Sequence, residues 1–324
     1  MTNISIAMAT YNGEKYLQQQ LDSIAAQSVL PDELVVCDDC SKDNTVEILE
    51  NFKNKVNFEV KILKNQINSG YIKNFARVIS ETKGNYIFLC DQDDFWFPNK
   101  IEVVLKTFKE NPNIQLVAHN AIITDSDLKS TEVTLFNSDR ENSSIVNGCI
   151  TCLRRAFLDS VLPIPECYEF DSWFTTVANR LNLRYNLDTA LSYYRRHNMA
   201  VTIDTVGKNT GIINKIRLKI KKNLKSLLNS RTRQYMDYRF NKIIVLLDYC
   251  QKICNQKTLF TVDSVQLENS IKELSDIKES FQNRYEAISK NGFDRFRSIL
   301  CCYKKGIYSR FHGYKTALDD LVRF

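Results

Sequence analysis

Residues 4–94 alternate between short apolar runs and longer amphipathic stretches, and this alternation restricts the fold more than any other feature of the chain. The apolar runs have the length and composition of β-strands, and the stretches between them place apolar residues at helical spacing. The expected strands are 4–10, 33–39, 58–65 and 85–94, and the expected helices are 14–28, 45–54 and 68–82. Strands that alternate with helices of about 10–15 residues predict βαβ units and a parallel sheet.

The pattern becomes more mixed after residue 114. We expect a strand at 115–124, a strand turning into a helix at 146–163, a helix at 170–183 and a final strand at 188–198. The predicted fold class is therefore α/β, Rossmann-like, with a mostly parallel central sheet flanked by helices.

Polar residues follow each of the first four predicted strands. They are Thr10 to Asn12, Asp38 and Asp39, Asn65 to Asn68, and Asp91 to Asp94. The carboxyl ends of parallel strands meet at one edge of the sheet, which is where ligands bind in such folds. The sequence therefore predicts one shared site, two of whose loops carry clustered carboxylates.

Asp91, Asp93 and Asp94 follow an apolar run directly, and three interpretations of them stay open. They could be solvated acids that cap a helix, because Asp is favoured in a first helical turn. They could form a carboxylate pair for general acid–base chemistry. They could also bind Mg²⁺ or Mn²⁺, because these cations prefer oxygen ligands and often combine one or two carboxylates with phosphates.

The order and spacing of these motifs closely resemble family 2 glycosyltransferases, which have the GT-A fold. The segments that carry the resemblance are SIAMATYNGEKYLQQQLDSIAAQSVLPDELVVCDDCSKDNT, NSGYIKNFA and GNYIFLCDQDDFW. It covers about residues 3–200, and the DQDD sequence makes the chain most similar to the rhamnosyltransferase-like members. The resemblance implies an inverting transfer of a sugar from a nucleotide-diphosphate donor.

The resemblance also implies the donor side of the site. Nucleotide and donor contacts are expected from Thr10, Tyr11, Asp38, Asp39, Asn68, Gly70, Asp91 and Asp94. Within this set, Asp91 is expected to face the ribose, and Tyr11 is alternatively a core residue. Mn²⁺ or Mg²⁺ is expected to be held by Asp93 together with Asp91 and His197.

The acceptor side is implied in the same way. Asp171 is the expected catalytic base, with Glu169 as its rival, because the residue before Asp171 departs from the family pattern. Gly148 and Trp173 are expected on the acceptor side, and Trp173 is alternatively a core residue. Either Arg195 or Arg196 is expected to neutralise phosphate charge.

The resemblance implies a metal-dependent hexosyl- or rhamnosyltransferase in surface polysaccharide biosynthesis, such as capsule or O-antigen. Its donor would be a UDP- or dTDP-sugar and its acceptor a glycan or lipid-linked glycan. Two alternatives stay open: a non-catalytic sugar-nucleotide-binding or scaffold protein of the same fold, and a nucleotidyltransferase. The segment MATYNGEKY lacks the Gly-rich, basic loop with which nucleotidyltransferases usually begin.

The charge of the chain divides at about residue 204. Residues 205–324 carry 24 Lys and Arg against 11 Asp and Glu, whereas residues 1–204 carry 20 against 27. We expect a GT-A catalytic domain at 1–204 and a basic α-helical region at 205–324. Residues 212–228 place apolar and lysine residues on opposite helical faces, which suits either an anionic membrane surface or packing on the protein.

The remaining helical region suits a bundle or a homo-oligomer contact. No nucleic-acid-binding module is recognisable, so we expect no nucleic-acid partner. No signal peptide or apolar stretch long enough to span a bilayer is recognisable either. We therefore expect a cytoplasmic protein, with the membrane surface as a peripheral site of attachment.

Overall fold

The computed structural model describes residues 3–135, 147–197, 233–255, 260–311, 316–317 and 320. The chain divides into two compact units, each described by itself below. Unit 1 is Met1–Thr202 with Thr258–Asp263, and unit 2 is Ile203–Lys257 with Ser264–Phe324. The predicted amphipathic helix at 212–228 lies outside the described residues. The assignment of functions to the two predicted domains stays a prediction.

Unit 1 is built on one mixed sheet in the order β3-β2-β1-β4-β8-β6-β9-β5, with β7 paired to β6. The strands are β1 (Ile4–Thr10), β2 (Glu33–Asp38), β3 (Glu59–Lys64), β4 (Tyr86–Cys90), β5 (Phe95–Trp96), β6 (Leu116–Thr124), β7 (Ser130–Thr134), β8 (Thr151–Arg154) and β9 (Arg184–Arg195). The pairs among β3, β2, β1 and β4 are parallel. Strand β8 then joins antiparallel to both β4 and β6, whereas β6 and β9 run parallel.

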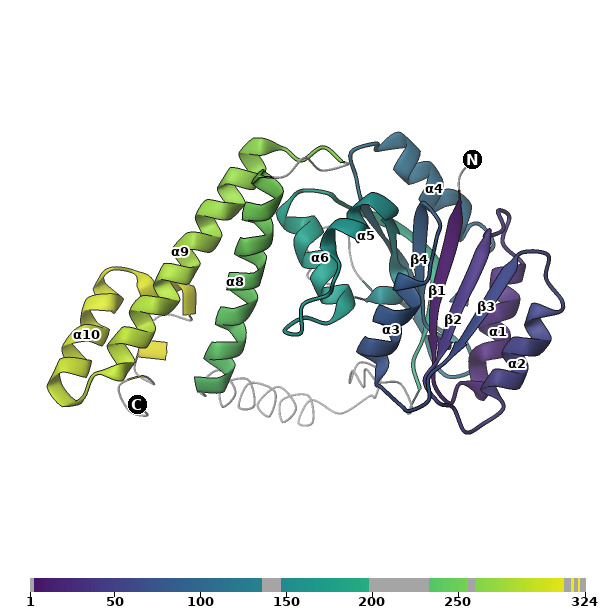
Figure 1. Cartoon of the computed structure of the whole chain (residues 1–324), viewed down its shortest axis with the longest axis horizontal. Coiled ribbons are helices and arrows are strands. Elements are labelled where there is room, and N and C mark those ends of the chain that lie inside the picture. The colour runs from purple at the N-terminus through teal and green to yellow at the C-terminus, as the bar shows by residue number, and fades with distance from the viewer. Residues whose placement is uncertain are drawn as a thin grey trace. The chain divides into compact units, whose positions relative to one another are not determined.

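Helices cover both faces of the sheet. They are α1 (Glu14–Ala25), α2 (Thr45–Lys53), α3 (Tyr71–Ser80), α4 (Lys100–Glu110), α5 (Arg155–Val161) and α6 (Phe170–Arg180), with a 3₁₀ turn η1 (Gly148–Ile150). Figure 1 shows α1 and α2 on one side of the first four strands and α3 on the other. This arrangement follows from right-handed crossovers in a sheet whose strand order reverses after β3.

The predicted α/β fold is confirmed. The central strands β1 and β2 are buried almost throughout, and α1 buries Leu17, Leu21 and Ile24 against the sheet. Three elements were not predicted: α4, β5 and β7. The two-residue β5 pairs antiparallel with β9 and returns the chain to the sheet directly after the acidic loop.

Unit 2 consists of helices. They are α8 (Arg233–Asn255), α9 (Ser264–Ser289) and α10 (Gly292–Lys304), followed by the 3₁₀ turn η2 (Ile307–Phe311). Its core includes Ile288, Ile299 and Tyr308, and the buried Arg284 guanidinium binds both carboxylate oxygens of Asp320 at 2.8 and 2.9 Å. No helix in the described part of the chain is long and apolar enough to cross a bilayer.

Candidate active site

The loops after β1 and β2 are joined through the Asp38 carboxylate. Its Oδ1 accepts a hydrogen bond from Thr10 Oγ1 at 3.0 Å, and its Oδ2 accepts one from the Ser41 amide at 2.9 Å. The Ser41 hydroxyl donates to the same carboxylate. Both Thr10 and Asp38 are buried. The two residues therefore lie together, as predicted, and their polar atoms hold the loops in place.

Asp39 organises the loop that follows β3. Its carboxylate accepts hydrogen bonds from the amides of Ser69 and Gly70, both at 2.8 Å, and from Asn65 Nδ2 at 2.6 Å. Burial raises the pKa of Asp39, but these hydrogen bonds outweigh it and lower the pKa overall. Asn68 Oδ1 accepts the Gly70 amide at 3.2 Å. Gly70 has φ of +85°, a conformation that favours glycine.

Tyr11 is 45% exposed at this edge, so the structure does not place it in the core. Its backbone is held by Gln92, a residue that was not predicted to belong to the site. Gln92 Oε1 accepts the Tyr11 amide at 2.9 Å, and Gln92 Nε2 donates to the Tyr11 carbonyl at 3.0 Å. The middle residue of the DQD sequence therefore connects the acidic loop to the loop after β1.

Asp91, Asp94 and Cys149 bring their side-chain ligand atoms within 4.8 Å of one another. Burial, followed by the charges of Asp94, Asp93 and Asp171, raises the pKa of Asp91 well above its ordinary value. Burial and the charge of Asp93 likewise raise the pKa of Asp94. The Asp94 carboxylate accepts hydrogen bonds from the Cys149 thiol and from the backbone amide of Arg195, the latter at 3.1 Å.

Asp93 lies beside His197, with 2.8 Å between Asp93 Oδ2 and His197 Nε2. The His197 ring in turn packs against Tyr16, with ring centroids 4.6 Å apart. The structure therefore brings together Asp93 and His197, which were predicted as metal ligands 104 positions apart. Asp91 belongs to the neighbouring cluster with Asp94.

Arg195 holds this arrangement in place. Its guanidinium donates to the backbone carbonyls of Asp93 and Ser126, both at 2.7 Å, and to Gln19 Oε1 at 2.6 Å. It also lies over the Tyr16 ring, 4.6 Å from the centroid, and the residue is only 4% exposed. These three hydrogen bonds use three of the five N–H donors of the guanidinium and give Arg195 a positioning role, while its expected neutralisation of phosphate charge stays a prediction. Arg196, the alternative, is half-buried.

The acidic loop fits a divalent cation. Carboxylate oxygen and imidazole nitrogen are both ligands that Mn²⁺ accepts, and Asp93 and His197 supply one of each at one place. Asp91 and Asp94 are neighbouring carboxylates whose pKa values rise, first because burial disfavours the charged form and second because like charges repel. A cation would remove that repulsion. The Cys149 thiol suits these hard cations less well than the carboxylates do.

Asp171 lies in the first turn of α6, beside Gly148, the residue that precedes Cys149 of this cluster. Its charge is one of those that raise the pKa of Asp91. Burial raises the pKa of Asp171 itself to about 6, although its carboxylate accepts amide hydrogen bonds from Ser172, at 2.6 Å, and Gly148. Its rival Glu169 is exposed and accepts a hydrogen bond from the Tyr71 hydroxyl. The geometry thus brings Asp171 toward the acidic loop.

The two residues predicted on the acceptor side differ in position. Gly148 is buried against α6, and a Cβ atom there would lie 2.8 Å from Phe170 Cε2 and 3.8 Å from Asp171 Cβ. Trp173 is 2% exposed, and its indole donates to the Val161 carbonyl at 2.7 Å. Trp173 is therefore a core residue, and its prediction as an acceptor contact is wrong.

Lys100 is a further residue beneath the acidic loop that was not predicted. It is buried in the first turn of α4, and its Nζ donates to the Cys149 carbonyl at 3.0 Å. The same Nζ lies 3.7 Å from the centroid of the Trp96 ring. Burial lowers the pKa of Lys100 to about 8. A lysine placed six residues after an acidic cluster was a signal that could have been read from the sequence.

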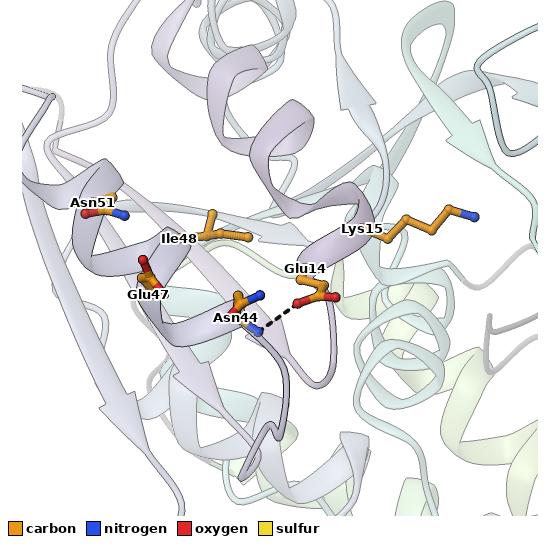
Figure 2. Close-up of a pocket in the computed structure, with 6 residues that line it drawn as sticks. All are labelled: Glu14, Lys15, Asn44, Glu47, Ile48 and Asn51. Carbon is orange, nitrogen blue, oxygen red and sulfur yellow. Dashed lines mark hydrogen bonds between the residues drawn. The ribbon is translucent and has the colours of Figure 1, made fainter.

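A separate surface pocket of about 590 Å³ lies between the start of α1 and α2. Figure 2 shows its lining, in which Glu14 accepts the Asn44 amide at 2.8 Å while the Lys15 side chain extends away from the other residues. The lining residues are Glu14, Lys15, Asn44, Glu47, Ile48 and Asn51. None of the predicted site residues lines this pocket.

Comparison with known proteins finds one matching family model and several similar proteins. Residues 5–161 match the family model described as Glycosyl transferase family 2. The chain is similar to the poly(ribitol-phosphate) β-N-acetylglucosaminyltransferase TarS of Staphylococcus aureus, 32% identical over 148 residues that cover 43% of this chain and 26% of TarS. It is also similar to TuaG of Bacillus subtilis, provisionally named a teichuronic acid biosynthesis glycosyltransferase. The two are 23% identical over 215 residues, which cover 62% of this chain and 84% of TuaG.

The crystal structure of S. aureus TarS 1–349 in complex with UDP-GlcNAc has the same fold. Its TM-score is 0.56 at 17% identity, and the match covers 94% of this chain and 81% of that chain. The chain spans between 26% and 44% of the length of the first curated relatives that it matches. The similarity to glycosyl transferase family 2 is thus carried by residues 5–161, just under half of the chain.

Proposed function

We propose that this protein is an inverting glycosyltransferase that moves a sugar from a nucleotide-diphosphate donor to a hydroxyl group of a glycan or lipid-linked glycan. One observation carries this proposal: Asp171 lies beside Gly148, where a Cβ would be 3.8 Å from Asp171 Cβ, and the next residue, Cys149, has its ligand atom within 4.8 Å of those of Asp91 and Asp94. A candidate base on α6 and a candidate diphosphate site after β4 therefore share one place. A scaffold protein has no need for that arrangement.

The donor nucleotide would bind along the edge formed by the loops after β1, β2 and β3. Tyr11 is exposed there and held by Gln92, so its ring is available to pack on a base. Asn68 and Gly70 lie exposed beside the carboxylate of Asp39. TarS has been crystallised with UDP and with UDP-GlcNAc, which supports a UDP-sugar as the first donor to test.

Asp93, His197 and Asp91 would hold Mn²⁺ or Mg²⁺, with Asp94 supporting the loop through its bonds to Cys149 and Arg195. A cation bound there supplies positive charge that stabilises a departing nucleoside diphosphate. Arg196 is the proposed side chain for the remaining phosphate charge.

Asp171 would take the proton from the acceptor hydroxyl. A base must be deprotonated to act, and a pKa of about 6 leaves Asp171 ionised at neutral pH while making it a stronger base than an ordinary carboxylate. The hydroxyl oxygen would attack the anomeric carbon from the side opposite the diphosphate. The anomeric configuration therefore inverts, and no covalent enzyme intermediate forms.

We infer a role in surface polysaccharide biosynthesis from the names of the relatives. TarS is named for transfer to poly(ribitol-phosphate), and TuaG for teichuronic acid biosynthesis. Both names refer to polymers, which supports a glycan rather than a small-molecule acceptor for this chain. A rhamnosyl donor, suggested by the DQDD sequence, belongs in the same donor screen.

The test is a screen of UDP- and dTDP-sugars for release of the nucleoside diphosphate, with Mn²⁺, with Mg²⁺ and with EDTA. We expect one donor to be turned over, and EDTA to abolish that turnover. Asp171→Asn should abolish transfer while leaving nucleotide affinity within about twofold, and the exposed Asp159→Asn should serve as the matched control. Glu169→Gln should retain most activity.

Four outcomes would contradict parts of this proposal. Turnover that is indifferent to EDTA would exclude the cation. Activity lost in Glu169→Gln but kept in Asp171→Asn would move the base. Binding of a sugar nucleotide without turnover of any donor would support a non-catalytic sugar-nucleotide-binding protein. Conversion of a UDP- or dTDP-sugar to the nucleoside triphosphate and the sugar 1-phosphate, dependent on added pyrophosphate, would support a nucleotidyltransferase.

A further inference from the structure

Helix α10 exposes a continuous apolar stripe. Phe293 is 76% exposed, Phe296 47%, Leu300 41% and Tyr303 45%. Their spacing of three, four and three residues places all four on one face of the helix. The rings of Phe293 and Phe296 stack at 6.3 Å, so the exposed surface is continuous at its N-terminal end.

The opposite side of α10 explains why the stripe is free. Ile299 and Cys302 are buried and belong to the core of unit 2. Figure 1 shows α10 beside the end of α9, the helix that precedes it. Because α10 already buries one apolar side there, folding does not account for the four exposed apolar residues. Exposed large apolar side chains grouped in this way mark a surface that binds something.

Cations border the stripe. Arg297 and Lys304 lie on the helix surface beside the stripe, and Lys305 comes directly after the last turn. All three are exposed, and none forms an ion pair with another residue that the structure describes. Residues 290–310 contain six Lys and Arg against one Asp. The surface is thus apolar along its centre and positive along its edge.

We propose that α10 is a membrane-surface helix that lays Phe293, Phe296, Leu300 and Tyr303 into the interface of an anionic lipid bilayer. Such a helix lies in the plane of the membrane, with apolar and aromatic side chains at the boundary between headgroups and acyl chains. Lys and Arg next to the apolar face attract anionic headgroups. The combination of an exposed aromatic stripe and cations without acidic partners has the chemistry of this occupant.

A second copy of the chain fits this surface less well. An aromatic side chain offers about 150–250 Å² when fully free, so the four partly exposed residues together offer about 400 Å². A stable dimer buries about 800 Å² on each partner. Pairing two α10 stripes would also bring their Arg297 and Lys304 side chains close together, where like charges repel. An anionic surface has neither difficulty.

The test is co-sedimentation of the full-length protein with vesicles of phosphatidylcholine alone and of phosphatidylcholine with 30% phosphatidylglycerol. We expect binding to the anionic vesicles and little to the neutral ones. A stripe variant, Phe293→Ser with Phe296→Ser and Leu300→Ser, should lose most of this binding. A charge variant, Arg297→Gln with Lys304→Gln and Lys305→Gln, should weaken it by about 100-fold, since each cation near the surface contributes about fivefold.

Two matched controls separate the stripe from general effects of surface change. Lys53→Gln with Lys55→Gln and Lys109→Gln removes three exposed lysines of unit 1, and Leu30→Ser with Val265→Ser removes two exposed apolar residues elsewhere. Both control variants should bind anionic vesicles like the wild type. Circular dichroism of each variant verifies folding. The charge variant alters only exposed side chains, so it should fold normally and test the proposal even if the stripe variant does not fold.

The possible outcomes decide the proposal. Failure of the wild type to bind anionic vesicles overturns it, as does wild-type binding by both α10 variants. A wild type that self-associates in analytical ultracentrifugation, with the stripe variant monomeric and no vesicle binding, assigns the surface to a second copy instead. None of these measurements uses a sugar donor, so they stand or fall independently of the proposed glycosyl transfer.

Discussion

The replacement Arg195→Lys distinguishes a positioning role from phosphate binding. The guanidinium of Arg195 reaches the carbonyl of Asp93 in the acidic loop, the carbonyl of Ser126 and the side chain of Gln19 in α1. Lysine keeps the positive charge but replaces a planar fork of five donors with one ammonium group. A residue that only neutralised phosphate would tolerate this change far better than one that joins three segments.

The expected cost follows from the hydrogen bonds that lysine cannot make. The ammonium group of lysine would satisfy one of the three acceptors and leave two without a donor. Asp93 and Ser126 are half-buried and Gln19 is exposed, so water can partly replace the lost donors. Each lost hydrogen bond then costs about 1 kcal/mol net, and Arg195→Lys should lower the free energy of unfolding by about 2 kcal/mol. That loss is measurable against the about 5–15 kcal/mol that stabilises a typical domain.

The assay is a urea titration followed by tryptophan fluorescence. The chain has two tryptophans, Trp96 and Trp173, and both lie in unit 1, so the signal follows this unit alone. The matched comparison is Arg196→Gln, which should leave the unfolding free energy within about 1 kcal/mol. Arg196→Gln should instead weaken affinity for the nucleotide-sugar donor. The unfolding free energy therefore reports on Arg195, and the donor affinity reports on Arg196.

An unfolding free energy of Arg195→Lys within about 0.5 kcal/mol of the wild type would refute this reasoning, because surface changes typically fall in that range. A stable Arg195→Lys that binds donor poorly would return Arg195 to the phosphate. Equal destabilisation by Arg196→Gln would show that the fork geometry is not the cause.

Three further changes test other parts of the site. Because burial raises the pKa of Asp171 to about 6, kcat/KM should fall about tenfold per pH unit below pH 6 and be level above it; a profile level to pH 5 would argue against this base. Gly148→Ala places a Cβ 2.8 Å from Phe170 Cε2. We therefore expect the free energy of unfolding, measured by urea titration, to fall by about 1–3 kcal/mol, and kcat to fall as well. Lys100→Ala removes a buried stem and the donor to the Cys149 carbonyl, so unfolding free energy should fall by about 2–5 kcal/mol, and an unchanged midpoint would contradict that role.

The first half of the fold was predictable because each of its elements has a local signal. Strands β1, β2 and β4 are apolar runs between helices with clear periodicity, and right-handed crossovers then leave little choice of sheet order. Helix α4 has the same kind of periodicity, in Ile101, Val104 and Phe108, and could have been predicted from it. Strand β5 could not, because two residues define no period and its partner β9 lies about a hundred positions away.

The location of the candidate site could be predicted from the sequence, but the contacts that each side chain makes there could not. Asp38 and Asp91 could be assigned to one edge because parallel strands end there. The sequence could not tell that the Asp39 carboxylate is surrounded by loop amides, or that the indole of Trp173 points into the core. Those facts depend on hydrogen bonds between segments that are far apart in the chain. Gln92, between two aspartates, gave no signal of its own.

The charge balance of the acidic loop favours a cation that arrives with the donor. Asp91, Asp93 and Asp94 place three carboxylates in one loop, in which Asp94 is buried and the other two are half-buried. Burial first, and like charges second, raise the pKa of Asp91 and of Asp94. Lys100 and Arg195 lie nearby, but their side chains donate to neutral oxygens rather than to these carboxylates. Protonation and a divalent cation are then the two ways to relieve the repulsion. A cation with few protein ligands would keep coordination positions for phosphate oxygens, so under the proposed function the diphosphate would complete a site that the protein alone leaves unbalanced.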